Sequence, residues 1–419
     1  MQIQEEKVFN YLKNFIFEDN DNLTSFPSNN TTLIEPIKVN GIQISKFVNE
    51  YWTSKQRQSS SIHEISYRAC FKAQLPRFFI QLLTLPGDTI YDPFSGRGTT
   101  VIEAGILNRR VISNDINPLS KIITYPRLSI PEVEEINNRI DVLPVDKALK
   151  ADIDLSMFYH PETEAEIVSI KQYLKDKKKS GKEDEVDCWI RMVATNRLTG
   201  HSPGFFSVYT LPPNQAVSPE SQIKINIKRK QQPDYRDTKK IIKRKTNSLL
   251  RNITSTEAEN LRKAATSALF FEKDAGHTIG IENGSVNLTV TSPPFLDVVQ
   301  YSKDNWLRCW FNDIDTLEIE KQITMSRTVE EWSMVMGQVF HELYRITKPG
   351  GWVAFEVGEV RNGKINLEEY VVPLGLTAGF KCLGIIINLQ EFTKTSNIWG
   401  VKNNNFGTNT NRIALFLKD

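Results

Sequence analysis

The segment DPFSGRGTT at 92–100 has the residue types of a ligand-binding turn. It lies between the strand-like run TIYDPF and the helix-like run TTVIEAGIL, so Gly96 and Gly98 fall where a strand passes into a helix. Glycines leave such a backbone bare enough for a ligand to lie against it, which suits a nucleoside cofactor. The spacing is neither the Walker motif nor G-x-G-x-x-G, which weakens ATPase and dehydrogenase interpretations. Taken alone, the segment fits a tight strand-helix turn equally well.

Asp115 ends a second strand-like run, RRVISND, about 20 residues beyond the glycine turn. A carboxylate at this place can accept hydrogen bonds from both hydroxyls of a ribose. By itself, Asp115 could instead cap the helix that begins near Pro118. Its distance from the glycine turn favours the ligand interpretation.

The tetrapeptide Ser292-Pro293-Pro294-Phe295 follows the apolar run VNLTVT. Open α/β sheets bind ligands at the carboxyl ends of their strands, so this tetrapeptide falls where a substrate would lie. Two prolines fix the backbone and present carbonyl oxygens, while the serine hydroxyl and the phenyl ring add an acceptor and a stacking surface. Such a group suits a planar heterocycle that carries an amino group. Without the other motifs, a structural Pro-Pro turn would be the better interpretation.

The elements that must position these residues form a strand-turn-helix-strand unit of about 30 residues, the building block of a mostly parallel α/β sheet. The regular pattern is lost from about Pro126 to Ser267 and returns at SVNLTVTSPPF. Thr328 begins a further helix, because Glu331 follows at capping-box spacing. The apolar face of that helix consists of Trp332, Met336, Val339, Phe340 and Leu343. Further strands are expected at GWVAFEV, KCLGIIINL and NRIALFL.

These motifs together resemble one enzyme family. DPFSGRGTT, NDINP, EKDAG at 272–276, TSPPF at 291–295 and ITKPGGWVAFEV at 346–357 are similar to motifs of the S-adenosyl-L-methionine-dependent DNA amino-methyltransferases. Those enzymes methylate N4 of cytosine or N6 of adenine, and the resemblance covers about residues 63–125 and 265–419. It implies an α/β fold, a Rossmann-like methyltransferase sheet with helices on both faces and a long inserted target-recognition region.

The resemblance also divides the chain. Residues 1–60, rich in Asn, Ser and Thr, would be an N-terminal extension of mixed and partly flexible character. Residues 61–125 and 265–419 would form the catalytic domain. The inserted region, 126–264, would recognise the target, although its place before Asp274 makes this an inference from position alone.

S-adenosyl-L-methionine is the cofactor that the resemblance implies. The turn from Asp92 to Gly98 would cradle its methionine end, Asp115 would hold the ribose, and Asp274 would lie near the adenine amino group. The expected cofactor-binding residues are Asp92, Pro93, Phe94, Gly96, Gly98, Thr99, Asp115 and Asp274. Ser292, Pro293, Pro294 and Phe295 would form the catalytic motif, and no metal is expected.

The chemistry expected of that motif is the activation of an exocyclic amine. The amine lone pair is delocalised into the ring, so Ser292 Oγ and the Pro293 carbonyl would accept its hydrogens and aim the lone pair at the methyl group. The base would be flipped out of the duplex and stacked on Phe295. A motif that begins with serine favours N4 of cytosine over N6 of adenine. Methylation of carbon 5 is disfavoured, because no cysteine of this chain follows a proline.

The inserted region contains the basic part of the chain. Between Ser221 and Lys263 there are 13 Lys or Arg against 4 Asp or Glu, although the whole chain has a net charge of only +2. IKINIKRK alternates like a strand and DTKKIIKRKTNSLLRN has the pattern of a basic helix, and either could contact a phosphate backbone. The expected DNA-binding residues are Lys228, Arg229, Lys230, Lys243, Arg244 and Lys245. The aromatic segment 196–215 fits a base-contacting loop and a small core of the insert equally well.

Composition restricts the remaining classes of protein. Four dispersed cysteines without a C-x-x-C pair argue against zinc, iron–sulfur and disulfide scaffolds, and the chain lacks a signal-peptide pattern and a membrane-spanning apolar run. A cytoplasmic enzyme acting on double-stranded DNA is expected, with a cognate restriction endonuclease as a candidate partner and without a membrane partner. The alternatives are adenine N6 methylation, an RNA amino-methyltransferase and a non-catalytic nucleic-acid-binding protein on the same scaffold.

Overall fold

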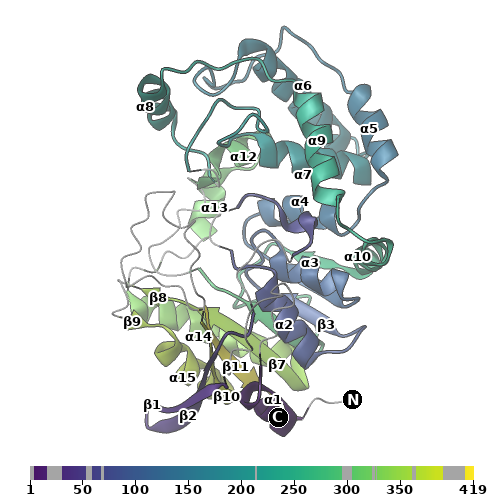
Figure 1. Cartoon of the computed structure of the whole chain (residues 1–419). Coiled ribbons are helices and arrows are strands. Elements are labelled where there is room, and N and C mark those ends of the chain that lie inside the picture. The colour runs from purple at the N-terminus through teal and green to yellow at the C-terminus, as the bar shows by residue number, and fades with distance from the viewer. Residues whose placement is uncertain are drawn as a thin grey trace, which may run out of the picture.

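The computed structural model describes residues 4–16, 31–52, 59–67, 70–212, 215–294, 304–322, 326, 328–360, 365–389 and 411–419. Two parts are visible in Figure 1: a sheet with its covering helices in the lower half and a group of helices above it. Phe295, the last residue of the predicted catalytic motif, lies outside the described residues.

Within the described residues, nine strands form one mixed sheet in the order β1-β2-β10-β11-β7-β6-β3-β4-β5. The five strands from β7 to β5 are parallel, and β11 runs antiparallel to both of its neighbours. Their bounds are β1 Leu33–Val39, β2 Ile42–Asn49, β3 Thr89–Asp92, β4 Arg110–Asn114, β5 Leu269–Phe271, β6 Val286–Thr291, β7 Thr347–Val357, β10 Lys381–Asn388 and β11 Asn411–Leu417. The strand order turns back at β3 and β6, the kind of switch point where α/β sheets bind ligands. The predicted α/β class is confirmed.

Helices cover both faces of this sheet (Figure 1). One apolar core includes residues of α2 (Gln74–Leu83) and α3 (Thr99–Ile106), and a second includes residues of α14 (Val329–Ile346) and α15 (Glu368–Ala378). The predicted start of α14 is confirmed, since Thr328 Oγ1 accepts a hydrogen bond of 3.1 Å from the Glu331 amide. The apolar face expected for this helix is buried along its whole length: Trp332, Met336, Val339, Phe340 and Leu343.

The described parts of the N-terminal region, residues 4–16 and 31–52, include elements that pack with the rest of the fold. α1 (Glu5–Lys13) and the hairpin of β1 and β2 belong to the fold, and β2 pairs in parallel with β10 at the edge of the sheet. Asn40 and Gly41 both have positive φ, as a two-residue hairpin turn requires. The Asn-Gly pair between two alternating runs was a signal for this hairpin in the sequence.

The helices above the sheet come mostly from the predicted insert. We call α5 (Val133–Asp141), α6 (Pro161–Lys179), α7 (Glu185–Arg197), α8 (Pro219–Arg229) and α9 (Thr238–Leu250) the helical unit. α10 (Ser255–Ser267) lies instead against α3, where Asn260 Nδ2 donates to the Ile106 carbonyl. α12 (Trp306–Phe311), which follows the insert in the chain, also contacts the helical unit. Asn312 Nδ2, just after α12, donates a hydrogen bond of 2.9 Å to Thr195 Oγ1 of α7.

The strand predicted at IKINIKRK is wrong: all but the last of these residues lie in α8, and Lys230 is its C-cap. Ser218 accepts a hydrogen bond from the Ser221 amide as the N-cap, and Pro219 occupies the first helical position. Both features favour a helix start, and they outweigh the alternation of the three isoleucines. The basic helix predicted just after it is confirmed as α9.

Candidate functional site

The two motifs that sequence spacing separates by almost 200 residues meet at the carboxyl ends of β3 and β6. These strands are parallel neighbours, with Ile90 opposite Leu288. Thr291 Oγ1, directly before the Ser-Pro-Pro turn, donates a hydrogen bond of 2.6 Å to Asp92 Oδ1, directly before the glycine turn. The sheet therefore places the predicted cofactor turn and the predicted catalytic turn side by side.

Asp92 is a buried carboxylate with one oxygen left over. Its side chain is 1% exposed, and Oδ1 accepts hydrogen bonds from Thr291 and from the Phe94 amide. Oδ2 is buried and has no hydrogen-bond partner among the described residues. Burial raises the pKa of Asp92 to about 7, although interactions with the Thr291 hydroxyl, the Phe94 amide and the Thr100 hydroxyl act to lower it. A buried acceptor without a partner costs free energy, so a bound donor at Oδ2 would be favourable.

The glycine turn needs glycine at both places. Gly96 and Gly98 have φ of +52° and +75°, which other residues rarely adopt. A Cβ at Gly98 would also lie 2.3 Å from the Thr124 side chain, so no larger residue fits there. Gly98 leads directly into α3, which begins at Thr99.

Asp115 fixes this turn from the neighbouring strand. Its Oδ2 accepts a hydrogen bond of 2.7 Å from the Gly96 amide, and its Oδ1 accepts one of 2.9 Å from the Asn117 amide. Burial raises the pKa of Asp115 to about 6 against the lowering effect of these bonds. Asp115 does not cap the following helix, because the Leu119 amide donates to Asn117 instead. Each carboxylate oxygen has a further lone pair for a ligand.

Asp274 lies in the next loop along the same edge, after β5. Its carboxylate is exposed and accepts a hydrogen bond from the Gly276 amide at 2.7 Å. Asn114, which sequence reasoning did not single out, joins the loops: its Nδ2 donates to the carbonyls of Pro93 and Lys273, and its Oδ1 accepts from the Lys273 amide. The loops after β3, β4 and β5 are thereby held together.

The Ser-Pro-Pro turn has a buried acid beside it that sequence reasoning missed. Glu356, near the end of β7, is 9% exposed and accepts a hydrogen bond of 2.5 Å from Asn411 Nδ2. Burial raises its pKa, whereas hydrogen bonds from Asn411 and Ser292 act to lower it. An acidic residue in the otherwise apolar run WVAFEV was the available signal. The Pro294 carbonyl accepts from Trp332 Nε1 at 2.9 Å, which ties the turn to α14.

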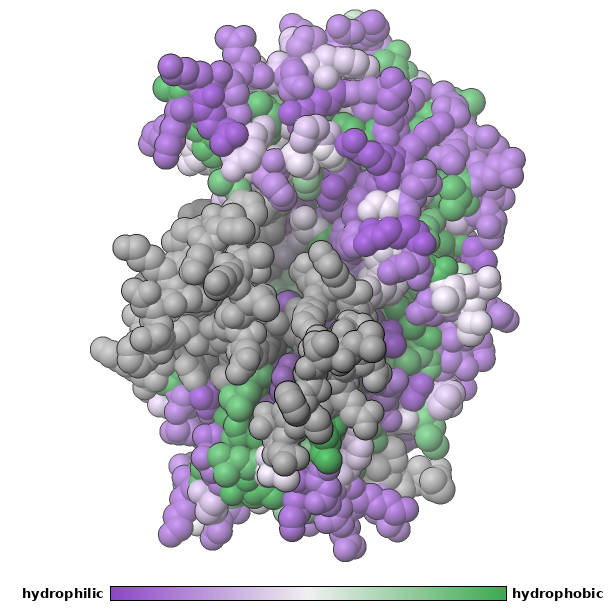
Figure 2. Space-filling view, viewed as in Figure 1, coloured by the Kyte–Doolittle hydropathy of each residue, from purple (hydrophilic) through white to green (hydrophobic). Residues whose placement is uncertain are grey.

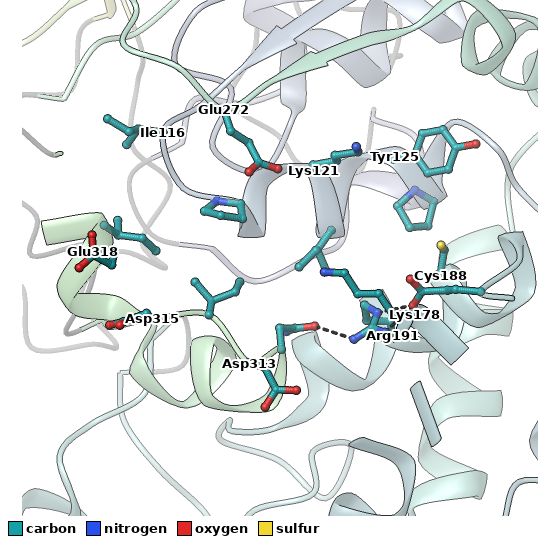
Figure 3. Close-up of a pocket in the computed structure, with 17 residues that line it drawn as sticks. Ile116, Lys121, Tyr125, Lys178, Cys188, Arg191, Glu272, Asp313, Asp315 and Glu318 are labelled. Atoms are coloured by element: carbon teal, nitrogen blue, oxygen red, sulfur yellow. Dashed lines mark hydrogen bonds and ion pairs between the residues drawn. The ribbon is translucent and has the colours of Figure 1, made fainter. Parts of the chain in front are cut away.

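A cavity of about 600 Å³ opens beside Asp115, between the sheet edge and the helical unit (Figure 3). Ile116 and Glu272 line it from the loops after β4 and β5, while Arg191 of α7 and, in the segment after α12, Asp313 and Glu318 line it from the opposite side. The volume lies within the range of small-molecule and cofactor pockets. Ile116 directly follows Asp115 and Glu272 lies two residues before Asp274, so the cavity adjoins two of the predicted cofactor-binding residues.

The predicted DNA-binding residues belong to two separate helices, α8 with the Lys230 that follows it, and α9 (Figure 1). Lys228, Arg229 and Lys230 are exposed at the end of α8, with the Arg229 guanidinium 3.7 Å from the centre of the Tyr209 ring. The cations of α9 contact other segments of the protein, except Lys240, which is 86% exposed. Lys243 forms an ion pair of 2.6 Å with Asp141, and Arg244 donates to the Pro203 carbonyl.

Lys245 fits a phosphate contact poorly. Its side chain is 10% exposed and lies 3.9 Å from the Glu64 carboxylate. Burial lowers its pKa to about 8, with a further lowering from Arg197. In the preceding aromatic segment, Phe205 and Phe206 are buried, so these two rings belong to the core of the insert, while His201 is exposed.

Two general features accompany this site. Within the described ranges, no cluster of three or more His, Cys, Asp or Glu is arranged to hold a metal ion. Among the helices of the same ranges, none combines the length and apolar character that a bilayer crossing requires.

Comparison with known proteins agrees with the geometry at the sheet edge. Residues 7–123 match the family model described as DNA methylase, of the N6 and N4 type. The predicted resemblance to the DNA amino-methyltransferases is confirmed. The matched segment includes most of the N-terminal residues that the motifs alone had left outside the resemblance.

Individual relatives match over short segments. The Type II methyltransferase M.BsoBI of Geobacillus stearothermophilus is 39% identical over 84 residues, which cover 19% of this chain and 16% of that protein. The Type II methyltransferase M.MjaI of Methanocaldococcus jannaschii is 38% identical over 64 residues, 15% of this chain and 21% of that protein. A tRNA (guanine(10)-N2)-dimethyltransferase of the same archaeon is 28% identical over 107 residues, 22% of this chain and 30% of that protein. The chain thus spans less than a third of the length of these curated relatives.

Solved structures give a weaker likeness. A protein of Thermus thermophilus described as a DNA modification methylase is 22% identical, with a TM-score of 0.22 over 35% of this chain and 50% of that chain. The rRNA methyltransferase AviRa of Streptomyces viridochromogenes is 10% identical, with a TM-score of 0.33 over 88% of this chain and 96% of that chain. With TM-scores this low, neither likeness carries weight, and the fold class rests on the strand order itself.

Proposed function

We propose that this protein is a site-specific DNA methyltransferase that transfers a methyl group from S-adenosyl-L-methionine to an exocyclic amine of a base in duplex DNA. The observation that carries the proposal is the hydrogen bond between Thr291 and Asp92, which joins the glycine turn to the Ser-Pro-Pro turn. A protein that only bound nucleic acid would need neither the buried carboxylate nor the paired turns.

The residues present fit the cofactor, whose sulfonium supplies an electrophilic methyl group when it is bound. Asp92 Oδ2 offers a buried acceptor, the turn at Gly96 and Gly98 leaves open backbone, and Asp115 has lone pairs to spare. We expect Pro93, Phe94 and Thr99 to complete this cradle and Asp274 to contact the far end of the cofactor. The cavity beside Ile116 would take an adenosine of ordinary size.

The protein's own part in the transfer is to activate and hold the amine. Ser292 Oγ and the Pro293 carbonyl would accept the two amine hydrogens, and Phe295 would stack on the base. Orientation of this kind can contribute on the order of 7–11 kcal/mol. Glu356, which shares a hydrogen bond with Ser292, would hold the serine hydroxyl in place. As the amine passes a proton to Ser292 Oγ, the serine would pass its own hydroxyl proton to the Glu356 carboxylate. In this role Glu356 is a positioning residue, because it acts through Ser292.

We favour N4 of cytosine over N6 of adenine, because the motif begins with serine. A serine hydroxyl accepts from either amine, so N6 of adenine is the first alternative. The helical unit would recognise the DNA target, within the inserted region 126–264. A cytoplasmic location and a partner restriction endonuclease belong to the same proposal, the latter supported by the Type II names of two relatives.

An RNA amino-methyltransferase is the second candidate function, because one relative is described as a tRNA guanine-N2 dimethyltransferase. The chemistry would be the same, and only the polymer would differ.

The test is to incubate the purified protein with tritiated S-adenosyl-L-methionine and either unmethylated plasmid DNA or tRNA, and to identify the labelled nucleoside after digestion. Label in N4-methylcytosine is expected. Label in N6-methyladenine would reverse the choice of base and keep the mechanism. Label in tRNA alone would overturn DNA as the substrate, and failure to bind the cofactor would overturn the whole proposal.

A further inference from the structure

α8 is the most exposed basic helix of the helical unit and has one buried residue, Gln222. Gln222 Nε2 donates to the Tyr209 carbonyl at 3.1 Å, Asn226 Nδ2 donates to the Met157 carbonyl at 2.8 Å, and the Arg229 guanidinium lies over the Tyr209 ring. These three residues recur every three or four positions, so they form one face of the helix. α8 is therefore attached to the helical unit by polar contacts along this face.

The opposite face of α8 combines apolar and basic side chains. Ile223 and Ile227 are 45% and 72% exposed, four residues apart and hence neighbours on the surface. Lys224 and Lys228 form a second exposed row beside them, and Lys230 follows the helix. No ion pair within 4 Å engages these three lysines in the described part of the chain. Figure 2 shows this end of the molecule as a hydrophilic surface broken by a few apolar residues.

We infer that α8 is the element that enters the major groove of duplex DNA, with Ile223 and Ile227 against base edges and Lys224, Lys228 and Lys230 on the phosphates. This inference rests on the proposed function and names the surface that would carry it. The major groove admits one α-helix, and its thymine methyl groups are the apolar feature that an isoleucine can contact. The charge of the segment from Ser218 to Lys230, four cations against Glu220, complements the phosphate backbone.

The alternative basic helix, α9, does not offer such a surface. Ile241, Ile242 and Leu249 of α9 are buried in the core of the helical unit. Four of its five cations contact Asp141, Glu64 and backbone carbonyls of other segments, and the fifth, Lys240, is exposed and pairs with Asp237 at the start of the same helix. A phosphate would have to break these contacts before it could bind, whereas on α8 it would meet solvated lysines.

The experiment begins with the wild-type protein, whose methylated site is mapped by sequencing DNA from a host without other methylation. Binding is then measured over a range of salt concentrations, on a short duplex with that site and on a scrambled duplex. The first variant is Lys224→Ala, Lys228→Ala and Lys230→Ala combined, with Lys240→Ala, 86% exposed on α9, as its control. The second is Ile223→Ala with Ile227→Ala, and its control is Val142→Ala, 76% exposed after α5.

The two variants should fail in different ways. Loss of three phosphate contacts should reduce the slope of log affinity against log salt by about 2 to 3 on both duplexes. The variant Ile223→Ala with Ile227→Ala should lose about tenfold in its preference for the duplex with the mapped site over the scrambled duplex. Its salt slope should stay unchanged. Uracil in place of thymine in that site should reproduce this loss in the wild type and add nothing in the isoleucine variant.

Several results would overturn the inference. Wild-type binding by the lysine variant, or an equal loss with Lys240→Ala, would remove α8 from the DNA surface. If the wild type binds the site equally well with uracil in place of thymine, the isoleucines do not contact thymine methyl groups. A change of oligomeric state in the isoleucine variant, seen by sedimentation, would assign the face to a second copy of the chain. Cofactor binding and methylation by the wild type are measured first, so failure of the proposed function is recognised separately.

Discussion

At the carboxyl edge of the sheet, the charged groups are withdrawn from solvent and bonded to one another, whereas on α8 they are exposed and separate. Asp92, Asp115 and Glu356 all have raised pKa values because of burial, and each is held by two or more hydrogen bonds. The lysines of α8 are exposed to solvent. A buried bonded group acts as part of a unit, so its loss should strongly slow catalysis or weaken cofactor binding, while exposed charges should contribute to DNA binding one by one.

α9 lies between these two cases and shows why charge counts mislead. In sequence its basic run is as strong as that of α8. In the structure, Asp141 and Glu64, which are far away in the chain, neutralise part of it. The number of cations in a segment therefore does not say how many can bind a phosphate.

The largest effect is expected at the buried end of this comparison. Ser292→Ala removes a hydroxyl that would accept an amine hydrogen, and we expect turnover to fall at least about 100-fold, a small part of the orientation term. Cofactor affinity should stay unchanged. Single-turnover transfer with labelled cofactor, together with calorimetric titration, measures both. Ser285→Ala, at the other end of the same strand, is the control and should resemble the wild type.

Glu356→Gln should lower turnover about 10- to 100-fold, toward the lower end of what a positioned proton acceptor contributes. In the wild type the rate should rise with pH through the raised pKa of Glu356, because only the carboxylate can take up the proton, and then level off. The variant should lose this rise. An unchanged pH–rate profile in Glu356→Gln would leave the residue a purely structural role.

Asp92 should make cofactor affinity depend on pH. Its pKa in the free protein is about 7, and a cationic ligand favours the carboxylate, so affinity should level off above that pKa and weaken below it. The expected weakening from pH 8 to pH 6 is about tenfold if the carboxylate stays ionised in the complex. Asp115, with a pKa of about 6, would add to it only at lower pH. Titration of Asp92→Asn should show weaker binding without this dependence.

Single exposed charges should have small, additive effects. Lys228→Ala should reduce the salt slope of DNA binding by about 0.9, the contribution of one phosphate contact. Its influence on turnover at saturating DNA should be negligible. Fluorescence anisotropy at several salt concentrations measures the slope, and a loss of turnover at saturation would contradict the separation between the two regions.

The smallest effect is expected on α9. Lys243→Ala breaks an ion pair whose partners are 30% and 63% exposed, and such pairs contribute less than about 1 kcal/mol to the free energy of unfolding. The DNA salt slope should not change. Urea unfolding and the same anisotropy series test this, and a slope reduced as far as in Lys228→Ala would return α9 to the DNA surface.

The motifs of the sheet edge could be predicted because they are local. The strand, the glycine turn and the helix after it lie within a few residues of one another, and Gly96 and Gly98 adopt the positive φ that their type suggests. The hairpin at Asn40 and Gly41 carried an equally local signal. The strand expected at IKINIKRK was wrong because a second local signal was overlooked: Ser218 and Pro219, just before this run, favour a helix start.

By itself, then, the sequence determined the α/β class, the turn chemistry and the family resemblance, since backbone preferences and short motifs act over a few residues. Only the tertiary structure decided that Thr291 bonds to Asp92, that Glu356 lies beside Ser292, and which basic helix remains free. The contacts of Asp92 and Ser292 depend on the order of strands in the sheet. The state of α9 depends on partners that are distant in the chain, such as Asp141, which lies 102 positions from Lys243. Burial and pairing are properties of the packed chain, and they decide what a charged residue can do.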